Sequence, residues 1–458
     1  MADQATPGAE TGNRGPLEEL RSLAGDCVHC GFCLPACPTY QLWGEEMDSP
    51  RGRIHLMTQV LDGAELTEAT ATHLDRCLGC MACVPACPSG VQYNRLIESA
   101  RSWLDDTGDR PAPGRGGFGR TLRGRATRAA IFALFPHPRR LRLATAPLRA
   151  AQRAGLDRLA RRSSLPGRLA PELAAALRLA PPPAGRVPAL PRLVPARGER
   201  RAVVGMLTGC VQGVFFPQVN TATARVLAAE GCDVVIPDGQ GCCGALSLHA
   251  GRRSEALRLA KHTIARFERA GVDAIVVNSA GCGSAMKEYG QLLADDPDWA
   301  ARAAELAGRV RDFAEFVAGL TGPGGQQAPR HPLPVTAVYH DACHLGHAQG
   351  IKAQPRQLLA AIPQLQLTET GDGGVCCGSA GVYNLLQPEA ARELGTRKAA
   401  TVQATGARLL ISANPGCSLQ IASALEAQGV VMPVAHTAQV LDASIRGLPV
   451  STLTRTTR

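Results

Sequence analysis

The 458-residue chain is poor in aromatic residues and in long apolar runs. Aromatics make up only 4% of it, although hydrophobic residues reach 45%. The apolar stretch AAIFALF at 129–135 is far shorter than the roughly 20 residues that a membrane helix needs. The N-terminus, MADQATPGAE, lacks the basic and apolar segments of a secretory signal. These features argue against a membrane-spanning or secreted protein and favour a cytoplasmic one with two or three domains.

Acidic residues are scarce in the middle of the chain. Between Arg110 and Arg201 there are 21 arginines and only three acids, among many Pro, Ala and Gly residues. Because aromatics are few and no nucleic-acid motif accompanies the arginines, we predict no nucleic-acid partner. Two interpretations stay open. The stretch IFALFPHPRRLRLATAPLRAAQRAGLDRLARR at 131–162 forms amphipathic helices that dock on a partner subunit or on the cytoplasmic face of the inner membrane, or the whole segment is a solvated linker.

Cysteine, by contrast, is abundant, and eight of the 17 cysteines lie in two short runs. CVHCGFCLPACPTY at 27–40 and CLGCMACVPACPSG at 77–90 both follow the pattern C-x2-C-x2-C-x3-C-P. Three thiolates at this spacing bind one cubane cluster, and the fourth, before the proline, binds the cluster of the other run. We therefore predict two [4Fe-4S] clusters, one held by Cys27, Cys30, Cys33 and Cys87 and one held by Cys37, Cys77, Cys80 and Cys83.

Disulfides and structural zinc are the alternatives for these runs. Disulfide frameworks belong to small secreted domains, whereas this chain is long and lacks a secretory signal. Zinc sites use two well-separated ligand pairs, often with histidine, and four closely spaced cysteines before a proline fit that pattern poorly. Iron-sulfur clusters in a reducing compartment are the favoured interpretation.

The second half of the chain carries a long internal repeat of cysteines. Corresponding cysteines of the two copies are separated by 133, 134, 134 and 135 residues, so four positions stay in register. The first copy holds Cys210, Cys242, Cys243 and Cys282, and the second holds Cys343, Cys376, Cys377 and Cys417.

Each copy has the pattern of an α/β unit. Short β-branched stretches such as RAVVGMLTGC and PVTAVYHDAC predict strands, and segments with helical spacing follow them. The cysteines then lie at the carboxyl ends of strands, where α/β proteins gather ligands. Gly244 and Gly378 follow the paired cysteines and permit a strained backbone there. We expect four converging thiolates in each copy, binding an iron-sulfur cluster or zinc; buried, packed cysteines are the alternative.

These motifs resemble known families over nearly the whole chain. The paired-cysteine copies are similar to the CCG domains of heterodisulfide reductases and their relatives. CVHCGFC, CPTYQL, DSPRGRIHLM and HLDRC resemble the iron-sulfur subunit of glycolate oxidase (glycolate dehydrogenase). The fullest CCG pattern has a fifth cysteine, but here Ser279 and Asn414 stand three residues before the last cysteine of each copy. This departure puts the enlarged noncubane cluster of heterodisulfide reductases in doubt.

The resemblance implies an α+β and α/β multidomain fold, with a mainly helical two-cluster ferredoxin domain followed by two repeated α/β CCG domains. The expected boundaries are 17–108 for the ferredoxin-type domain, 109–200 for the basic linker with amphipathic helices, 201–320 for CCG repeat 1 and 331–445 for CCG repeat 2.

A few single residues have two interpretations each. Arg51 and Arg53 are expected either to lie near a cluster and raise its potential or to be solvated at a helix terminus. His340, His344 and His347 bracket Cys343; one of them could replace a missing cysteine ligand, but capping or surface placement is favoured because repeat 1 has no histidine there. Cys232 has no partner nearby in the sequence and is expected in the core.

No catalytic residues are predicted. The chain shows no nucleophilic triad, and GRGGFG at 114–119 follows no apolar strand, so it is not a dinucleotide fingerprint. The resemblance implies an electron-transfer subunit beside flavin-containing subunits that oxidise glycolate, with quinone or another carrier as acceptor. A related lactate or glycerol-3-phosphate oxidising complex, or a catalytic disulfide or quinone reductase of CCG type, remains the alternative.

Overall fold

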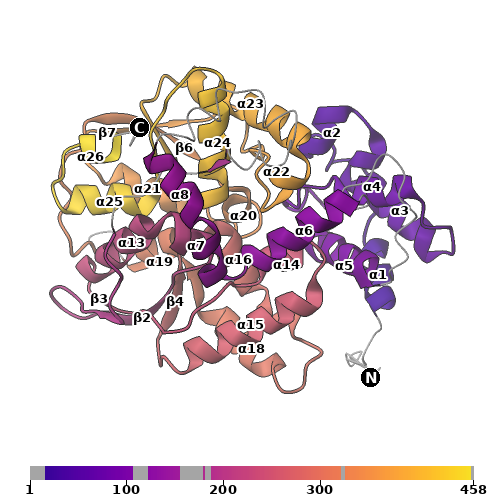
Figure 1. The fold of residues 1–458 in the computed structure, drawn as a ribbon, viewed down its shortest axis with the longest axis horizontal. Coiled ribbons are helices and arrows are strands. Elements are labelled where there is room, and N and C mark those ends of the chain that lie inside the picture. The colour runs from indigo at the N-terminus through magenta and orange to yellow at the C-terminus, as the bar shows by residue number, and fades with distance from the viewer. Residues whose placement is uncertain (1–15, 107–121, 155–178, 181–186, 321–324, 455–458) are drawn as a thin grey trace, which may run out of the picture.

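The computed structural model describes residues 16–106, 122–154, 179–180, 187–320 and 325–454. A helical N-terminal region lies at one end, beside two α/β regions that each contain a mainly parallel sheet (Figure 1). The expected fold class is therefore confirmed. Across the described residues, no helix is long and apolar enough to span a membrane.

The N-terminal region is built from short helices joined by the two cysteine runs. Proline begins α2, directly after Cys37, because its fixed φ suits the first helical position. Ser49 caps α3 by accepting a hydrogen bond of 2.9 Å from the Gly52 amide. The helices are α1 (Pro16–Gly25), α2 (Pro38–Trp43), the 3-10 helix η1 (Glu46–Asp48), α3 (Pro50–Leu61), α4 (Glu68–Asp75) and α5 (Tyr93–Asp106).

The first sheet has the strand order β1-β3-β2-β4-β5, and only the short edge pairing of β1 with β3 is antiparallel. The second sheet has the order β7-β6-β8-β9 and is parallel throughout. The first sheet contains β1 (Leu193–Val194), β2 (Ala202–Leu207), β3 (Cys232–Val235), β4 (Ala274–Val277) and β5 (Val310–Asp312). The second contains β6 (Val335–His340), β7 (Leu365–Glu369), β8 (Leu409–Ser412) and β9 (Val434–Ala435).

Helices cover both sheets and join them through a shared apolar core. Helix α13 packs on α25 and α19 packs on α21, and the core between them combines buried residues of both sheets. Cys232 is fully buried in this core, as expected. Around the first sheet lie α12 (Val211–Phe215), α13 (Pro217–Ala229), α14 (Ala245–His249), α15 (Arg253–Glu268), α16 (Ala280–Lys287), α17 (Tyr289–Leu292), α18 (Ala300–Arg309) and α19 (Phe313–Leu320). Around the second lie α20 (Cys343–Gly346), α21 (Ala353–Ala360), α22 (Tyr383–Leu386), α23 (Pro388–Ala404), α24 (Pro415–Ala427), α25 (Thr437–Ile445) and α26 (Ser451–Thr454).

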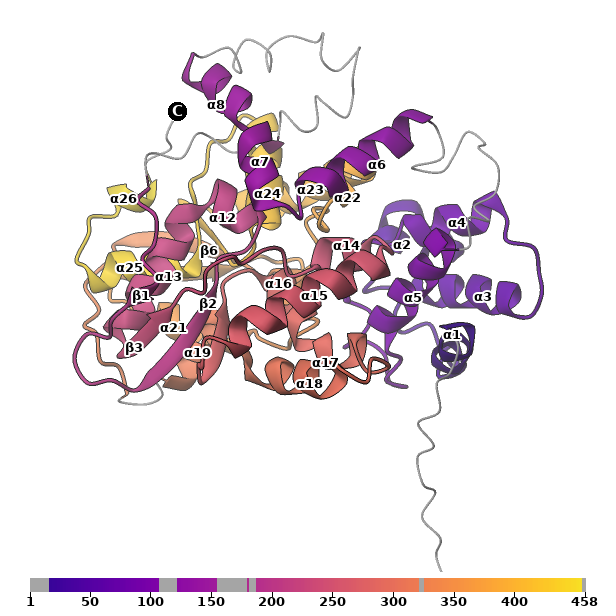
Figure 2. The ribbon, with the colours of Figure 1, turned by 60° about the horizontal axis from the view of Figure 1, so that its bottom comes forward.

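In the described part of the predicted linker, 109–200, the helices α6 (Leu122–Leu134), α7 (Pro138–Ala144) and α8 (Ala146–Arg153) lie along the two α/β regions (Figure 2), while its last residues supply β1 of the first sheet. Phe132 and Ile131 are buried against Val382 and Leu246, so this apolar face of α6 is already covered by the protein itself. The remainder of the predicted membrane- or partner-docking stretch, residues 155–162, lies outside the described residues. Docking through the linker stays a prediction.

Candidate metal centres

The two N-terminal cysteine loops have the same backbone conformation. In each loop the residues immediately before and after the second cysteine have positive φ: His29 (52°) and Gly31 (85°) in the first, Gly79 (62°) and Met81 (59°) in the second. Non-glycine residues adopt this conformation at a cost of roughly 1 kcal/mol or more. Two sequences that place glycine on opposite sides of the cysteine nevertheless fold alike here, which indicates that the ligand-binding geometry, and not local propensity, determines the loop.

The fourth cysteine of each run lies close to the other run. The charge of Cys87 acts on Cys27, and the charge of Cys37 acts on both Cys80 and Cys83. Burial raises the pKa of the Cys83 thiol well above its ordinary value, so a positive charge such as bound iron is needed to keep it ionised. This donor set fits the crossed pair of [4Fe-4S] clusters, whose ligand assignment stays a prediction.

The two ligand sets differ in exposure. All cysteines of the predicted second set, Cys37, Cys77, Cys80 and Cys83, are buried. In the predicted first set Cys30 is exposed and the other three are partly buried. The side chains that flank Cys30 are apolar and open to solvent: Val28 is 67% exposed and Phe32 is 68% exposed.

Arg53 lies in the interior, beneath the second set of cysteines, and not at a solvated helix terminus. It donates hydrogen bonds to the His73 carbonyl (2.6 Å), to Thr39 Oγ1 (3.1 Å) and to Asp48 Oδ1 (3.3 Å). Burial opposes ionisation of Asp48, but the hydrogen bond from His73 and the charge of Arg53 outweigh it and hold the pKa of that carboxyl below its usual value. The charges of Cys77 and Cys37 in turn act on Arg53.

Arg51 lies over the first loop. Its guanidinium donates to the His29 carbonyl at 3.0 Å and to Glu46 Oε1 at 2.8 Å, and a Cβ on Gly31 would come within 2.8 Å of it. The two arginines thus lie beside different loops, and their tuning of the cluster potentials stays a prediction.

In the first α/β region the four cysteines converge at the carboxyl ends of β2, β3 and β4. Cys210 Sγ lies 3.5 Å from Cys242 Sγ, Cys242 interacts with Cys243, and Cys243 interacts with Cys282. Gly244 has the positive φ of 90° that this arrangement requires. Hydrogen bonds from Cys242 and Cys282 lower the pKa of the Cys243 thiol well below its usual value.

The second α/β region repeats this chain of contacts. Cys343 interacts with Cys376, Cys376 with Cys377, and Cys377 with Cys417, while Gly378 has a φ of 84°. The hydrogen bond from Cys377 and the neighbouring imidazole of His340 outweigh burial and lower the pKa of Cys417 to about 5.

Ser279 and Asn414, which replace the fifth cysteines, face each other across the boundary of the two regions. Ser279 Oγ donates to Asn414 Oδ1 at 3.4 Å, and Asn414 Nδ2 donates to Cys417 Sγ at 3.4 Å. The fifth positions therefore make hydrogen bonds to each other and to a thiol.

Sequence reasoning was wrong about His340. Instead of capping a helix or lying at the surface, it is 1% exposed at the end of β6. It forms a buried group with Cys377 and Cys417. Each of the three residues offers one ligand atom, and these atoms all lie within 4.8 Å of one another. The presence of histidine before Cys343, with no counterpart in repeat 1, was the signal that could have identified this position.

The helical region contacts the second repeat through its second cysteine loop. Cys80 packs in one cluster with Cys343 and Cys376, and the charge of Cys376 acts on Cys80. Tyr383 of α22 donates a hydrogen bond of 3.2 Å to the Arg76 carbonyl in the same interface. Sulfur atoms of repeat 2 thus face those of the helical N-terminal region, residues 16–106, which is called the ferredoxin-like region below.

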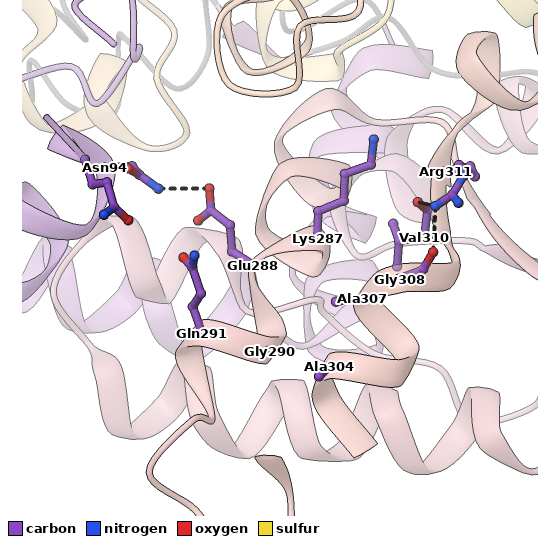
Figure 3. A pocket seen from close by; sticks show the side chains of 11 residues that line it. Asn94, Lys287, Glu288, Gly290, Gln291, Ala304, Ala307, Gly308, Val310 and Arg311 are labelled. Atoms are coloured by element: carbon purple, nitrogen blue, oxygen red, sulfur yellow. Dashed lines mark hydrogen bonds between the residues drawn. The ribbon is translucent and has the colours of Figure 1, made fainter. Parts of the chain in front are cut away.

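The contact with the first repeat uses titratable groups. His249 Nδ1 lies 2.7 Å from Glu98 Oε1, and Asn94 donates to Glu288 Oε1 at 3.1 Å. Burial and the charge of Glu98 raise the pKa of Glu288 to about 7. Figure 3 shows Asn94 and Glu288 facing each other. Both residues line an open groove with a volume of about 640 Å³. No cysteine is among the described residues that line this groove, so it lies apart from the metal chemistry.

Three known domain families match the chain. A 4Fe-4S dicluster domain matches residues 24–91, the linker region of glycolate oxidase iron-sulfur subunits matches 123–180, and the cysteine-rich CCG domain matches twice, at 204–287 and 337–422. The dicluster match implies two [4Fe-4S] clusters in the helical region.

Three curated proteins with sequences similar to this chain are the following. The probable glycolate oxidase iron-sulfur subunit of Bacillus subtilis is 39% identical over 409 residues, which cover 88% of this chain and 90% of that protein. The glycolate oxidase iron-sulfur subunit of Escherichia coli is 36% identical over 413 residues, covering 89% and 91%. Lactate utilization protein A of Shouchella clausii is 33% identical over 239 residues, covering 52% of this chain and 98% of that protein.

Proposed function

The chain belongs to the family of glycolate oxidase iron-sulfur subunits, and from this premise we propose that it is the electron-transfer subunit of a 2-hydroxy acid oxidising complex. Flavin-containing partner subunits oxidise glycolate to glyoxylate, and this chain passes the electrons toward quinone. Oxidation of the 2-hydroxy acid releases two electrons at once, whereas each of the two [4Fe-4S] clusters accepts and passes one electron at a time.

The observation that carries the proposal is the pair of similarly folded cysteine loops, one partly exposed and one buried against repeat 2. Cys27, Cys30, Cys33 and Cys87 hold the outer cluster and Cys37, Cys77, Cys80 and Cys83 the inner one. The buried guanidinium of Arg53 stabilises the negative charge of the inner thiolates, and Arg51 does the same over the outer loop.

The face around Cys30 is where the flavin subunit docks. Electrons reach a cluster fastest where its ligands approach the surface, and Cys30 is the exposed cysteine of the two described loops. Val28 and Phe32 surround it with apolar surface of the kind that protein interfaces bury.

Anaerobic iron and sulfide analysis, together with EPR after dithionite reduction, tests the cluster assignment. We expect about eight iron atoms in the two loops and signals of two interacting [4Fe-4S] clusters. Cys87→Ser should alter the cluster of the first loop although Cys87 belongs to the second run. Protein that is colourless and EPR-silent would contradict the proposal.

The partner role is tested separately with Phe32→Glu in the reconstituted complex. A charge on this face should weaken docking and lower glycolate-dependent reduction of the clusters, while dithionite reduction stays normal. Val431→Glu is the matched control, because Val431 is also exposed, at 48%, but lies between α24 and β9 of the second α/β region. Equal effects of the two changes would place the docking face elsewhere.

A catalytic reductase of CCG type is the weaker alternative. The paired cysteines are only 1–3% exposed, so an external disulfide would not reach them without rearrangement. Loss of turnover with normal cluster reduction, after both pairs are changed to serine, would favour it.

A further inference from the structure

Both ring nitrogens of the buried His340 lack an oxygen or nitrogen partner of ordinary hydrogen-bond geometry, and the groups on which its imidazole acts are the thiols of Cys417 and Cys376. Leaving a polar group unsatisfied in the interior costs about 1–3 kcal/mol, so such a group requires an explanation. The strand β6 ends at His340 and directs its side chain toward Cys417, whose charge and hydrogen bonding it influences. The unsatisfied imidazole therefore faces thiols and not solvent.

The donor atoms of this group have the spacing of ligands around one metal ion. Zinc binds thiolate at about 2.3 Å and imidazole at about 2.0–2.1 Å, so two donors of a tetrahedral site lie about 3.5–3.8 Å apart. The ligand atoms of His340, Cys377 and Cys417 all lie within 4.8 Å of one another, which is close to that spacing. A cluster would place several iron and sulfide atoms between its thiolates and hold them farther apart.

A fourth donor is available beside these three. Cys376 hydrogen-bonds Cys377 and is influenced by the charge of His340, but its Sγ is outside the set of donor atoms that all lie within 4.8 Å of one another, so it must turn inward to complete the site. Three thiolates and one imidazole are a common donor set of structural zinc sites.

The first repeat has no counterpart of His340. The residue three before Cys210 is Leu207, which corresponds to His340 three before Cys343, and its side chain is 2% exposed in an apolar cluster. The two repeats therefore offer different donor sets although their cysteines correspond one to one.

We propose that repeat 2 binds a single zinc-type divalent ion through His340, Cys377, Cys417 and Cys376, with the histidine taking the ligand role that the absent fifth cysteine leaves open. The ion is structural: it fixes the loop of Cys376, against which Cys80 of the helical region packs. This site is independent of electron transfer by the two ferredoxin-type clusters.

Full-length protein, purified anaerobically, tests the site by metal analysis and by X-ray absorption at the zinc edge. We expect one zinc per chain, with a first shell of sulfur and one imidazole nitrogen. His340→Leu, which copies repeat 1, should weaken zinc retention against a chelator by at least roughly 100-fold and remove the imidazole scattering. The EPR signals of the two clusters report whether the variant is folded.

Two further variants keep the test decisive if His340→Leu does not fold. His340→Cys preserves a donor, so zinc should remain bound in a shell made of sulfur alone. His347→Gln is the matched control: His347 lies in the same segment and contacts the Gly374 carbonyl at 3.2 Å, so its change should leave zinc and its nitrogen scattering intact. Wild-type protein without zinc, iron in place of zinc at this site, or unchanged nitrogen scattering in His340→Cys would each overturn the proposal.

Discussion

The two CCG repeats share a fold and a cysteine series but meet the ferredoxin-like region in different ways. Repeat 1 contacts it through Glu98, His249 and Glu288, whereas repeat 2 contacts it through Cys80, Cys343 and Cys376. Repeat 2 alone places a histidine at the end of its central strand, where repeat 1 has Leu207. The two repeats thus keep one scaffold, while residues on their helices and loops give repeat 1 an interface of titratable groups and repeat 2 an interface lined by sulfur.

The difference between the two repeats is tested most strongly by removing one corresponding cysteine from each of them. Cys377→Ser should lower the free energy of unfolding by about 3–4 kcal/mol, the stabilisation that an ion provides at roughly 100 to 1,000 times its dissociation constant. Cys243→Ser should cost about 1 kcal/mol when repeat 1 carries no metal, because it then removes only hydrogen bonds within a thiol network. Thermal or denaturant unfolding under anaerobic conditions measures both; equal losses would remove the distinction between the repeats.

Converting repeat 1 toward repeat 2 gives the next largest effect. Leu207→His should cost about 2 kcal/mol with a chelator present, because the imidazole is buried without a partner. Added zinc should recover part of this loss, because Cys243 and Cys282 lie nearby. Leu207→Met keeps the apolar volume and is the control. If zinc raises the unfolding temperature of both variants equally, the histidine at the strand end does not account for the difference between the repeats.

Removing one hydrogen bond between repeat 2 and the ferredoxin-like region should have a smaller effect. Tyr383→Phe deletes the donor to the Arg76 carbonyl and should cost on the order of 1 kcal/mol. Hydrogen exchange of the amides around residues 76–83 should rise in this variant and stay unchanged around α14. A uniform rise in both places would show that the hydroxyl acts on the whole fold.

The smallest expected effect is a pH dependence at the repeat 1 interface. Since burial and Glu98 raise the pKa of Glu288 to about 7 from an ordinary 4.5, the folded protein keeps a proton that the unfolded chain loses. Stability should therefore fall as pH rises from about 4.5 to 7 and then level off. Glu288→Gln should remove this slope, which is worth on the order of 1 kcal/mol after allowance for partial exposure. A melting-temperature series from about pH 5 to 8 checks it, and an unchanged slope would assign the titration to another group.

Local patterns predicted the loops and the repeat well. The C-x2-C-x2-C-x3-C-P spacing anticipated two equivalent loops, and the offset of about 134 residues anticipated cysteines at corresponding strand ends. The strands β2 and β6 are present where the stretches RAVVGMLTGC and PVTAVYHDAC predicted them. Local patterns could not predict the buried position of Arg53. Its partners Asp48, Thr39 and His73 come from three separate segments of the chain.

The sequence by itself determined the ligand chemistry and the duplicated scaffold, because thiol spacing and strand periodicity act over a few neighbouring residues. Only the tertiary structure decided which residues complete each site. Cys80 meets Cys376 from a distant part of the chain, Ser279 meets Asn414, and His340 turns inward toward Cys417. Such contacts depend on how whole elements pack, and burial then sets whether an imidazole is a solvated side chain or a metal ligand.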